Sequence, residues 1–209
     1  FIPYPTARSN DRLLTGADLD PESFQKAPDG SYWIGEELNP SLLHFDQNGK
    51  LLAPPYLLTG LASVENPRGE TATLPRSRGF EGMAQSPDGT KLFPLLEGTM
   101  LNAEPGLNIY TFDIETKQFT NTHANEPSYR YKLDDDASAI GDFTLYNETS
   151  GLVIERDSKQ VAEAVAKKIY KVDFGQLDTD GFLHKILVAD LMRIKDPDDL
   201  NKDGVDLYT

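Results

Sequence analysis

The chain has 209 residues, of which 34 are Asp or Glu and 20 are Lys or Arg, so its formal net charge is −14 at pH 7. Negative charge on this scale argues against nucleic acid as a partner, because the phosphate backbone attracts basic proteins. The absence of cysteine excludes disulfides, thiolate metal sites and a thiol nucleophile.

The first third of the chain predicts short strands separated by turns. Pro28-Asp29-Gly30 is a turn, because proline presets φ at one corner and glycine supplies a positive φ. Apolar and polar side chains alternate over residues 31–37, as is typical of a strand. Further strands are expected at residues 13–19, 42–45 and 50–56.

The remainder of the chain continues in the same manner. Pro87-Asp88-Gly89 repeats the turn pattern, and residues 161–168 favour a helix or a mobile insertion. No apolar run approaches the about 18 residues of a transmembrane helix, so we expect no membrane span. Strands are expected at residues 80–84, 91–96, 108–113, 118–122, 129–133, 142–146, 151–155, 169–174 and 184–189.

One pattern occurs three times: an acidic residue, a turn, an apolar strand that ends in glutamate, and a strand that ends in aspartate. A repeat of several tens of residues built from short strands predicts a radial β architecture with one unit per blade. The acidic residues are Asp18, Glu36, Glu37 and Asp46 in the first unit, Glu81, Glu97 and Asp113 in the second, and Asp142, Glu155 and Asp173 in the third.

The predicted fold class is therefore all-β, a β-propeller-like arrangement of short antiparallel sheets. No linker divides the chain, so residues 1–209 are expected to form a single domain. Three or four blades leave such a ring open, and we therefore expect an incomplete propeller that is truncated at its C-terminus.

A radial arrangement gathers the acidic strand ends of different units. Clustered carboxylates raise one another's pKa unless a cation or an arginine neutralises them. Ca²⁺ accepts six to eight oxygen ligands in flexible geometry, which makes it the expected ion. The alternative is that each residue is a solvated strand end. The candidates are Asp18, Asp20, Glu22, Glu36, Glu37, Glu81, Glu97, Asp142 and Glu155. Of these, the expected metal ligands are Asp18, Glu36, Glu81, Asp142 and Glu155.

Glu155-Arg156-Asp157 is the sharpest local feature. Glu155 ends a run that predicts a buried strand, where a carboxylate needs a partner. Arg156 has the geometry to hold a phosphate or a carboxylate through two hydrogen bonds. The alternative is a structural Glu–Arg pair between blades.

Other motifs are weaker. Residues 199–204 match the front half of an EF-hand-type calcium loop, but the match is incomplete and a plain Asp/Asn/Gly turn is the favoured interpretation. The three histidines lack the spacing of a zinc site, and no Gly-x-Ser-x-Gly elbow supports a serine hydrolase.

Three strings together resemble the phytase-like domain family, also described as esterase-like activity of phytase. They are residues 16–22 with 29–37, residues 79–84 with 87–89, and residues 152–157. The resemblance extends from about Leu13 to Leu191. It implies a propeller-like fold, secretion or a periplasmic location, and phosphoester hydrolysis.

These observations predict a calcium-dependent phosphoester hydrolase that acts on a small-molecule phosphoester or ester. Glu36, Glu81, Glu155 and Arg156 are its expected catalytic residues. In this hypothesis bound metal neutralises the phosphoester and lowers the pKa of a water, while Arg156 steadies the phosphate oxygens. Two alternatives are a non-catalytic secreted propeller that calcium stabilises and that binds a protein or glycan, and a lactone or carboxylester hydrolase.

Overall fold

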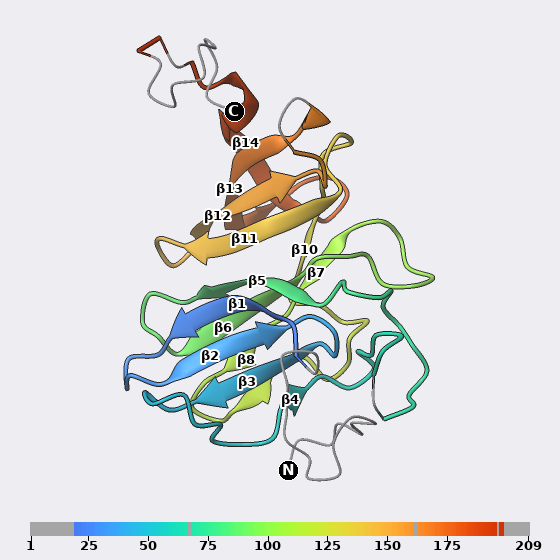
Figure 1. Ribbon diagram of the computed structural model, residues 1–209, viewed down its shortest axis with the longest axis vertical. Coiled ribbons are helices and arrows are strands. Elements are labelled where there is room, and N and C mark those ends of the chain that lie inside the picture. The colour runs from blue at the N-terminus through green and yellow to red at the C-terminus, as the bar shows by residue number, and fades with distance from the viewer. Residues whose placement is uncertain (1–18, 67, 161–162, 196, 199–209) are drawn as a thin grey trace.

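The computed structural model describes residues 19–66, 68–160, 163–195 and 197–198. In this part of the chain the fold is all-β, and three antiparallel sheets follow one another along the sequence (Figure 1). No helix among these residues is long and apolar enough to cross a membrane.

We term the three sheets blade 1, blade 2 and blade 3. Blade 1 contains β1 (Pro21–Lys26), β2 (Tyr32–Glu36), β3 (Ser41–Phe45) and β4 (Tyr56–Leu57) in that order. Blade 2 contains β5 (Phe80–Gln85), β6 (Lys91–Leu96), β7 (Leu107–Ile109), β8 (Phe112–Asp113), β9 (Gln118–Phe119) and β10 (Tyr129–Tyr131). Blade 3 contains β11 (Ala139–Leu145), β12 (Ser150–Arg156), β13 (Lys167–Leu177) and β14 (Leu183–Asp190), followed by the 3₁₀ turn η2 (Leu191–Arg193).

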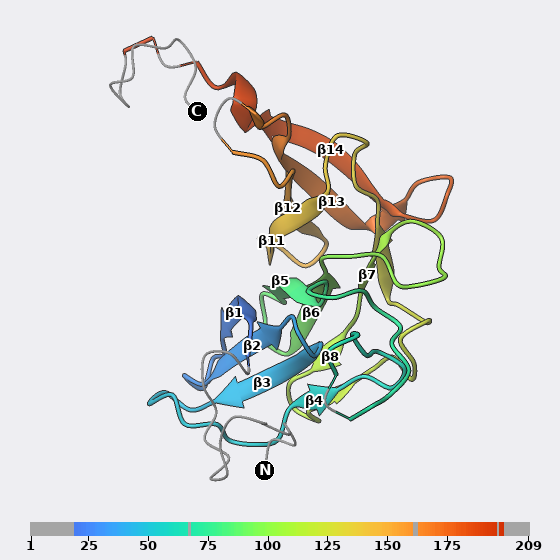
Figure 2. The same cartoon turned by 45° about the vertical axis from the view of Figure 1, so that its right-hand side comes forward.

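The first strands of the three blades, β1, β5 and β11, lie side by side (Figures 1 and 2). Ser23 Oγ in β1 donates to the carbonyl of Phe80 in β5 at 3.0 Å. On the other side of β5, a Cβ added to Gly82 would lie 2.9 Å from the Ile140 side chain of β11. The missing side chain at Gly82 thus allows β5 and β11 to approach closely, with the Phe143 backbone nitrogen 3.2 Å from the same Cβ position. This succession of first strands gives the molecule its propeller-like arrangement.

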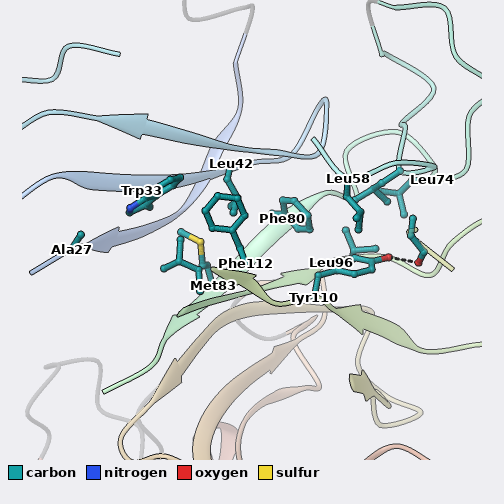
Figure 3. Close-up of a cluster of buried hydrophobic side chains, with 13 residues drawn as sticks. Ala27, Trp33, Leu42, Leu58, Leu74, Phe80, Met83, Leu96, Tyr110 and Phe112 are labelled. Atoms are coloured by element: carbon teal, nitrogen blue, oxygen red, sulfur yellow. Dashed lines mark hydrogen bonds between the residues drawn. The ribbon is translucent and has the colours of Figure 1, made fainter. Parts of the chain in front are cut away.

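Two apolar clusters hold the blades together. Between blades 1 and 2, Trp33 packs against Phe112 with ring centroids 5.0 Å apart, and Phe80 and Met83 complete the centre of this core (Figure 3). Tyr110 is buried there because its hydroxyl donates to the Ala124 carbonyl at 2.7 Å. Between blades 2 and 3, the core contains Ala84, Phe93, Leu95, Leu107, Ile109, Tyr131, Ile140, Phe143, Val153, Val172 and Leu183.

The turn between the first two strands of each blade is fixed by the same kind of hydrogen bond from a backbone N–H to a side chain. Asp29 accepts the backbone N–H of Ser31 at 2.9 Å, and Asp88 accepts that of Thr90 at 3.0 Å. In blade 3, Asn147 accepts the N–H of Thr149 at 2.9 Å. These are Asx turns, in which a short polar side chain fixes the backbone two residues on. The predicted turns at residues 28–30 and 87–89 are confirmed.

A β-bulge also recurs at the start of the first strand in each blade. The extra residue is Glu22 in β1, Glu81 in β5 and Gly141 in β11. The neighbouring strand then ends in equivalent pairs: Glu36 and Glu37, Leu96 and Glu97, and Glu155 and Arg156. A bulge re-aims the side chain that it carries. These three bulges set the geometry of the candidate site.

Most of the expected strands are present, and the differences have physical reasons. β1 was missed because its sequence is polar and begins with proline, which a strand tolerates at its first residue. The strand expected at residues 50–56 is reduced to β4 and an isolated bridge from Leu51 to Phe45. The helix expected at residues 161–168 is wrong for Lys167 and Lys168, which begin β13. The strand expected at residues 13–19 lies almost wholly outside the described residues.

Candidate metal centre

The bulges of blades 1 and 2 bring acidic side chains to one place. Glu22 and Glu81 are the bulged residues, and Glu37 and Glu97 directly follow the neighbouring strands β2 and β6. Asp20 precedes β1, and its carbonyl accepts the N–H of Glu37 at 3.0 Å. Five carboxylates, those of Asp20, Glu22, Glu37, Glu81 and Glu97, thus come from two neighbouring blades. We term them the acidic cluster.

The distances within the acidic cluster suit a cation. Carboxylate oxygens of Glu37, Glu81 and Glu97 lie within 4.8 Å of one another, and so do those of Asp20, Glu22 and Glu37. Glu37 therefore belongs to both groups. Only oxygen donors are present in these groups, which is the donor set of a hard cation such as Ca²⁺ or Mg²⁺.

Two arginines reach the acidic cluster. Arg156, which follows Glu155 at the end of β12, donates through Nη2 to Glu81 at 3.0 Å and to Glu97 at 2.9 Å. Arg78 pairs with the other oxygen of Glu97. Five carboxylates and two guanidinium groups leave a surplus of three negative charges when all are ionised. The residues present therefore fit a divalent cation.

Ser77 supports one end of the cluster. Its hydroxyl donates to Glu37 at 2.7 Å, and its backbone has a φ of 50°. A positive φ is uncommon for a residue other than glycine and costs on the order of 1–3 kcal/mol. The surrounding structure holds Ser77 in this conformation, in which its hydroxyl meets the carboxylate.

Burial and mutual repulsion raise the pKa of three carboxyl groups of the acidic cluster. Burial, together with the neighbouring Glu97 and Glu81, raises the pKa of Glu37 to about 8. Burial raises the pKa of Glu81 to about 7, although its hydrogen bond to Arg156 opposes the shift. Burial and the adjacent Asp20 also raise the pKa of Glu22. Without a further cation, Glu37 and Glu81 hold protons for part of the time near neutral pH.

We predict that the metal-free protein loses stability as the pH rises from about 4.5 to about 8. The ordinary glutamate pKa of 4.5 applies to the unfolded chain, whereas Glu37 and Glu81 titrate at about 8 and about 7 when folded. The unfolded state therefore releases these protons first, and a rising pH favours it. Urea denaturation in a chelator at a series of pH values measures the slope.

A double variant, Glu37→Gln with Glu81→Gln, is the control and should show a much smaller slope in this range. Saturating Ca²⁺ should remove the slope in the native sequence, because the cation favours the ionised acids. A metal-free stability that is flat or rises over this range would contradict the assignment.

Glu36 lies at the edge of the cluster but faces away from it, because successive side chains of a strand point to opposite sides. It is fully buried, and its carboxylate accepts backbone N–H groups from Asp20 at 3.0 Å and Leu38 at 3.2 Å, and also from Asn39. Burial raises its pKa and these donors oppose the rise. Glu36 thus fixes the backbone on both sides of the site.

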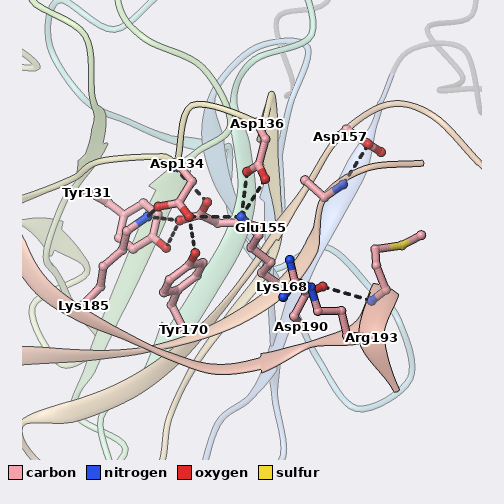
Figure 4. A network of polar contacts seen from close by, with 12 residues as sticks. Tyr131, Asp134, Asp136, Glu155, Asp157, Lys168, Tyr170, Lys185, Asp190 and Arg193 are labelled. Carbon is pink, nitrogen blue, oxygen red and sulfur yellow. Dashed lines mark hydrogen bonds and ion pairs between the residues drawn. The ribbon is translucent and has the colours of Figure 1, made fainter. Parts of the chain in front are cut away.

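Glu155 occupies the position in blade 3 that Glu36 occupies in blade 1. It is fully buried and accepts hydrogen bonds from the Tyr131 hydroxyl, the Asp134 N–H and the Lys185 ammonium (Figure 4). Its carboxylate is therefore used between blades 2 and 3, since Tyr131 belongs to β10 and Lys185 to β14. Figure 4 shows the network continuing through Asp134 to Tyr170 and Lys168.

The other expected ligands lie elsewhere. Asp142 is exposed on β11, where its carboxylate accepts the N–H of Phe143 at 2.7 Å. It belongs to neither of the two acidic groups found among the described residues. Asp18 and the EF-hand-like residues 199–204 lie outside the described residues. Of the expected site residues, the structure brings Glu81 and Arg156 together.

The candidates drawn from the sequence included Asp20, Glu22, Glu37 and Glu97, but these four were not chosen as the expected ligands. One pattern in the sequence connects two of the five acids: Glu22 and Glu81 each stand seven residues before the aspartate of a Pro-Asp-Gly turn. Aligning the units on these turns would have shown that Glu22 and Glu81 are equivalent positions.

The family now follows from comparison with known proteins. Residues 4–207 match the family model described as "Phytase-like: Esterase-like activity of phytase". The chain belongs to the phytase-like family. The matched range includes all of the propeller-like all-β fold described above. The match also agrees with the resemblance seen in the sequence. A search of curated proteins found no match for this chain.

Several solved structures are remotely similar to this phytase-like chain. A puromycin hydrolase mutant complexed with PGG is 12% identical, with a TM-score of 0.41, over 88% of this chain and 22% of that one. Hsv2 of Kluyveromyces lactis is 12% identical, with a TM-score of 0.38, over 81% of this chain and 46% of that one. A luciferin-regenerating enzyme is 13% identical, with a TM-score of 0.39, over 78% of this chain and 59% of that one.

The phytase-like chain therefore spans between 22% and 59% of the length of these three structures. Similarity this remote transfers no activity. What the chain does must be argued from its own acidic cluster.

Proposed function

We propose that this phytase-like chain binds Ca²⁺ at the acidic cluster and uses it to hydrolyse small-molecule phosphoesters. The observation that carries the proposal is the surplus of carboxylates over arginines among Asp20, Glu22, Glu37, Glu81 and Glu97. Such a surplus is costly near neutral pH unless a further cation is present. The phytase-like description, which names an esterase-like activity, supports a hydrolytic role.

Each part of the site has a distinct role in this proposal. Glu37, which is shared by the two acidic groups, would be the central ligand, and Glu81 and Asp20 would complete the two sides. Bound Ca²⁺ would supply positive charge to a phosphoester and lower the pKa of a nearby water. Glu36 and Ser77 hold the backbone and the Glu37 carboxylate in position.

The arginines would orient the substrate. The side chains of Arg78 and Arg156 are 40% and 34% exposed, so both are partly accessible to solvent beside their carboxylate partners. Guanidinium groups bind phosphate oxygens through paired hydrogen bonds. An anionic substrate would otherwise be repelled by a protein of net charge −14.

A secreted or periplasmic location belongs to the same proposal. Extracellular calcium modules bind their ion at about 10⁻⁴–10⁻³ M, a range that suits a site already partly neutralised by two arginines. Tagging the native gene product and fractionating cells would test the location directly.

A second candidate is a calcium-stabilised propeller without catalysis. Glu37, Glu81 and Glu97 are only 6%, 7% and 4% exposed. This burial suits an enclosed structural ion. At a calcium concentration of about 100 times Kd, binding adds about 2.7 kcal/mol, or about 5–10 °C in Tm for a chain of this size. Both candidates predict this shift.

Turnover distinguishes the two candidates. We expect the protein to hydrolyse para-nitrophenyl phosphate in millimolar Ca²⁺ and to stop when a chelator removes the ion. Para-nitrophenyl acetate and a simple lactone should be assayed in parallel, because preference for either would assign a carboxylester or lactone hydrolase. A calcium-dependent rise in Tm without turnover of any of these esters would reject catalysis and leave the structural role.

A further inference from the structure

A cleft of about 450 Å³ opens at one end of blade 2. One wall is the loop between β6 and β7, which contributes Met100, Leu101 and Asn102. The other wall contains His123 and Asn125, from the connection between β9 and β10, and Gly60 closes one end. This volume lies within the range of small-molecule sites, and the lining combines apolar side chains with polar ones.

The cleft and the acidic cluster share the loop between β6 and β7. Glu97 begins this loop and belongs to the cluster, while Met100, three residues later, lines the cleft. A chain extends at most about 3.6 Å per residue, so their Cα atoms lie within about 11 Å. Gly98, between them, donates its N–H to the Arg78 carbonyl at 3.3 Å. The Arg78 side chain pairs with Glu97 and packs over Gly98, where an added Cβ would lie 2.7 Å from it, so this arginine lies along the loop that joins the two places.

The cleft has a rigid frame. Arg130 donates to the carbonyls of Glu104 and Pro105 at 3.1 and 3.0 Å, and its guanidinium lies 4.5 Å from the ring centroid of Phe182 in blade 3. At the floor, Asn108 donates to the Tyr110 hydroxyl at 3.0 Å. These contacts fix the loop before any ligand arrives, which lowers the entropic cost of binding.

The chemistry of the walls indicates the ligand. Met100 and Leu101 offer apolar surface, and the Met100 sulfur is held by Asn108 at 3.2 Å and by the Tyr110 hydroxyl at 3.6 Å. Asn102 and Asn125 offer amide groups, and Asn102 is held at a φ of 59°, a conformation that asparagine tolerates better than most residues. His123 adds an imidazole. A flat organic group with one or two hydrogen-bonding atoms matches this set.

We propose that this cleft binds the aryl or other apolar organic group of the ester whose phosphoryl group is held at the acidic cluster. The inference rests on the proposed function, because it assigns a substrate class to the same site. It selects esters of aromatic or similarly apolar alcohols over esters of small aliphatic alcohols.

To test the proposal, a large side chain is introduced at the edge of the cleft so that it occupies the space of the ligand. Ala103 lines the cleft and is exposed, so Ala103→Trp should fold normally. We expect it to weaken the binding of methylumbelliferone, an aryl alcohol followed by its fluorescence below the pKa of its phenol, by about tenfold or more. The KM for methylumbelliferyl phosphate should rise by a similar factor. Leu52→Trp, at an exposed apolar position between β3 and β4, is the matched control and should leave both values unchanged.

The two proposals fail in different ways. Binding of methylumbelliferone needs neither calcium nor turnover, so an absence of hydrolysis alone rejects the proposed function and leaves the cleft as an aryl-binding site. Equal binding by native protein and Ala103→Trp, with unchanged Tm, would overturn the assignment of the cleft. So would a native protein that does not bind methylumbelliferone at all.

Discussion

Replacing Glu81 by glutamine lowers the calcium-dependent turnover of para-nitrophenyl phosphate by about a hundredfold or more in our account. Glu81 is buried, carries the bulge of β5 and lies within 4.8 Å of both Glu37 and Glu97. The substitution removes one negative ligand from the centre of the cluster but keeps the size of the side chain. Steady-state kinetics over a range of calcium concentrations measures the loss.

The fold should survive this substitution. Because burial raises the pKa of Glu81 to about 7, a neutral side chain is already tolerated at this position. We therefore expect the metal-free Tm near neutral pH to be unchanged or higher. Glu115→Gln, at an exposed turn of blade 2, is the matched control and should retain full activity. Full activity of Glu81→Gln with unchanged calcium dependence would exclude the acidic cluster as the catalytic site.

Replacing Glu155 by alanine has the largest expected effect on stability, a loss of about 3–5 kcal/mol. Glu155 is fully buried and is the common acceptor for the Tyr131 hydroxyl, the Asp134 N–H and the Lys185 ammonium (Figure 4). Its removal leaves a largely buried lysine short of one partner and two further donors without an acceptor. Urea denaturation gives the difference in unfolding free energy.

Calcium binding separates this role from a metal-ligand role. In conditions where Glu155→Ala is folded, it should bind Ca²⁺ with the native affinity. Glu148→Ala, an exposed residue in the hairpin of the same blade, should change neither stability nor affinity. A Glu155→Ala protein of native stability that no longer binds Ca²⁺ would restore Glu155 as a ligand. It would also reject the assignment of the Glu155 side chain to the face of β12 that points away from the acidic cluster.

The sequence contained enough information for the fold class but too little for the site. Pro28-Asp29-Gly30 and its repeat at Pro87-Asp88-Gly89 are local signals, because the turn geometry depends on those residues alone. The unit length and the alternating strands then predict blades. β1 escaped prediction because it is held by pairing with β2 and by side-chain bonds to β5, such as that of Gln25 to the Met83 carbonyl at 2.7 Å.

The site depends on strand parity, which the sequence does not reveal. Glu36 and Glu37 are adjacent, and so are Glu155 and Arg156, yet in each pair only the second side chain reaches the acidic cluster. A shift of one residue exchanges the two faces of a strand. The acidic strand ends thus indicated which blades build the site, whereas the β-bulges decide which side chains enter it.

The central claim is that carboxylates of blades 1 and 2 share a divalent cation. Crystals of the protein soaked with a lanthanide, which substitutes for Ca²⁺ and scatters anomalously, test it most directly. We predict one or two anomalous peaks in contact with Glu37, flanked by Glu81 and Asp20, and their loss in Glu37→Gln. Peaks at Asp142 or Glu155 would contradict the account. So would an acidic cluster that binds no ion at saturating lanthanide, with its carboxylates protonated or paired only with arginines.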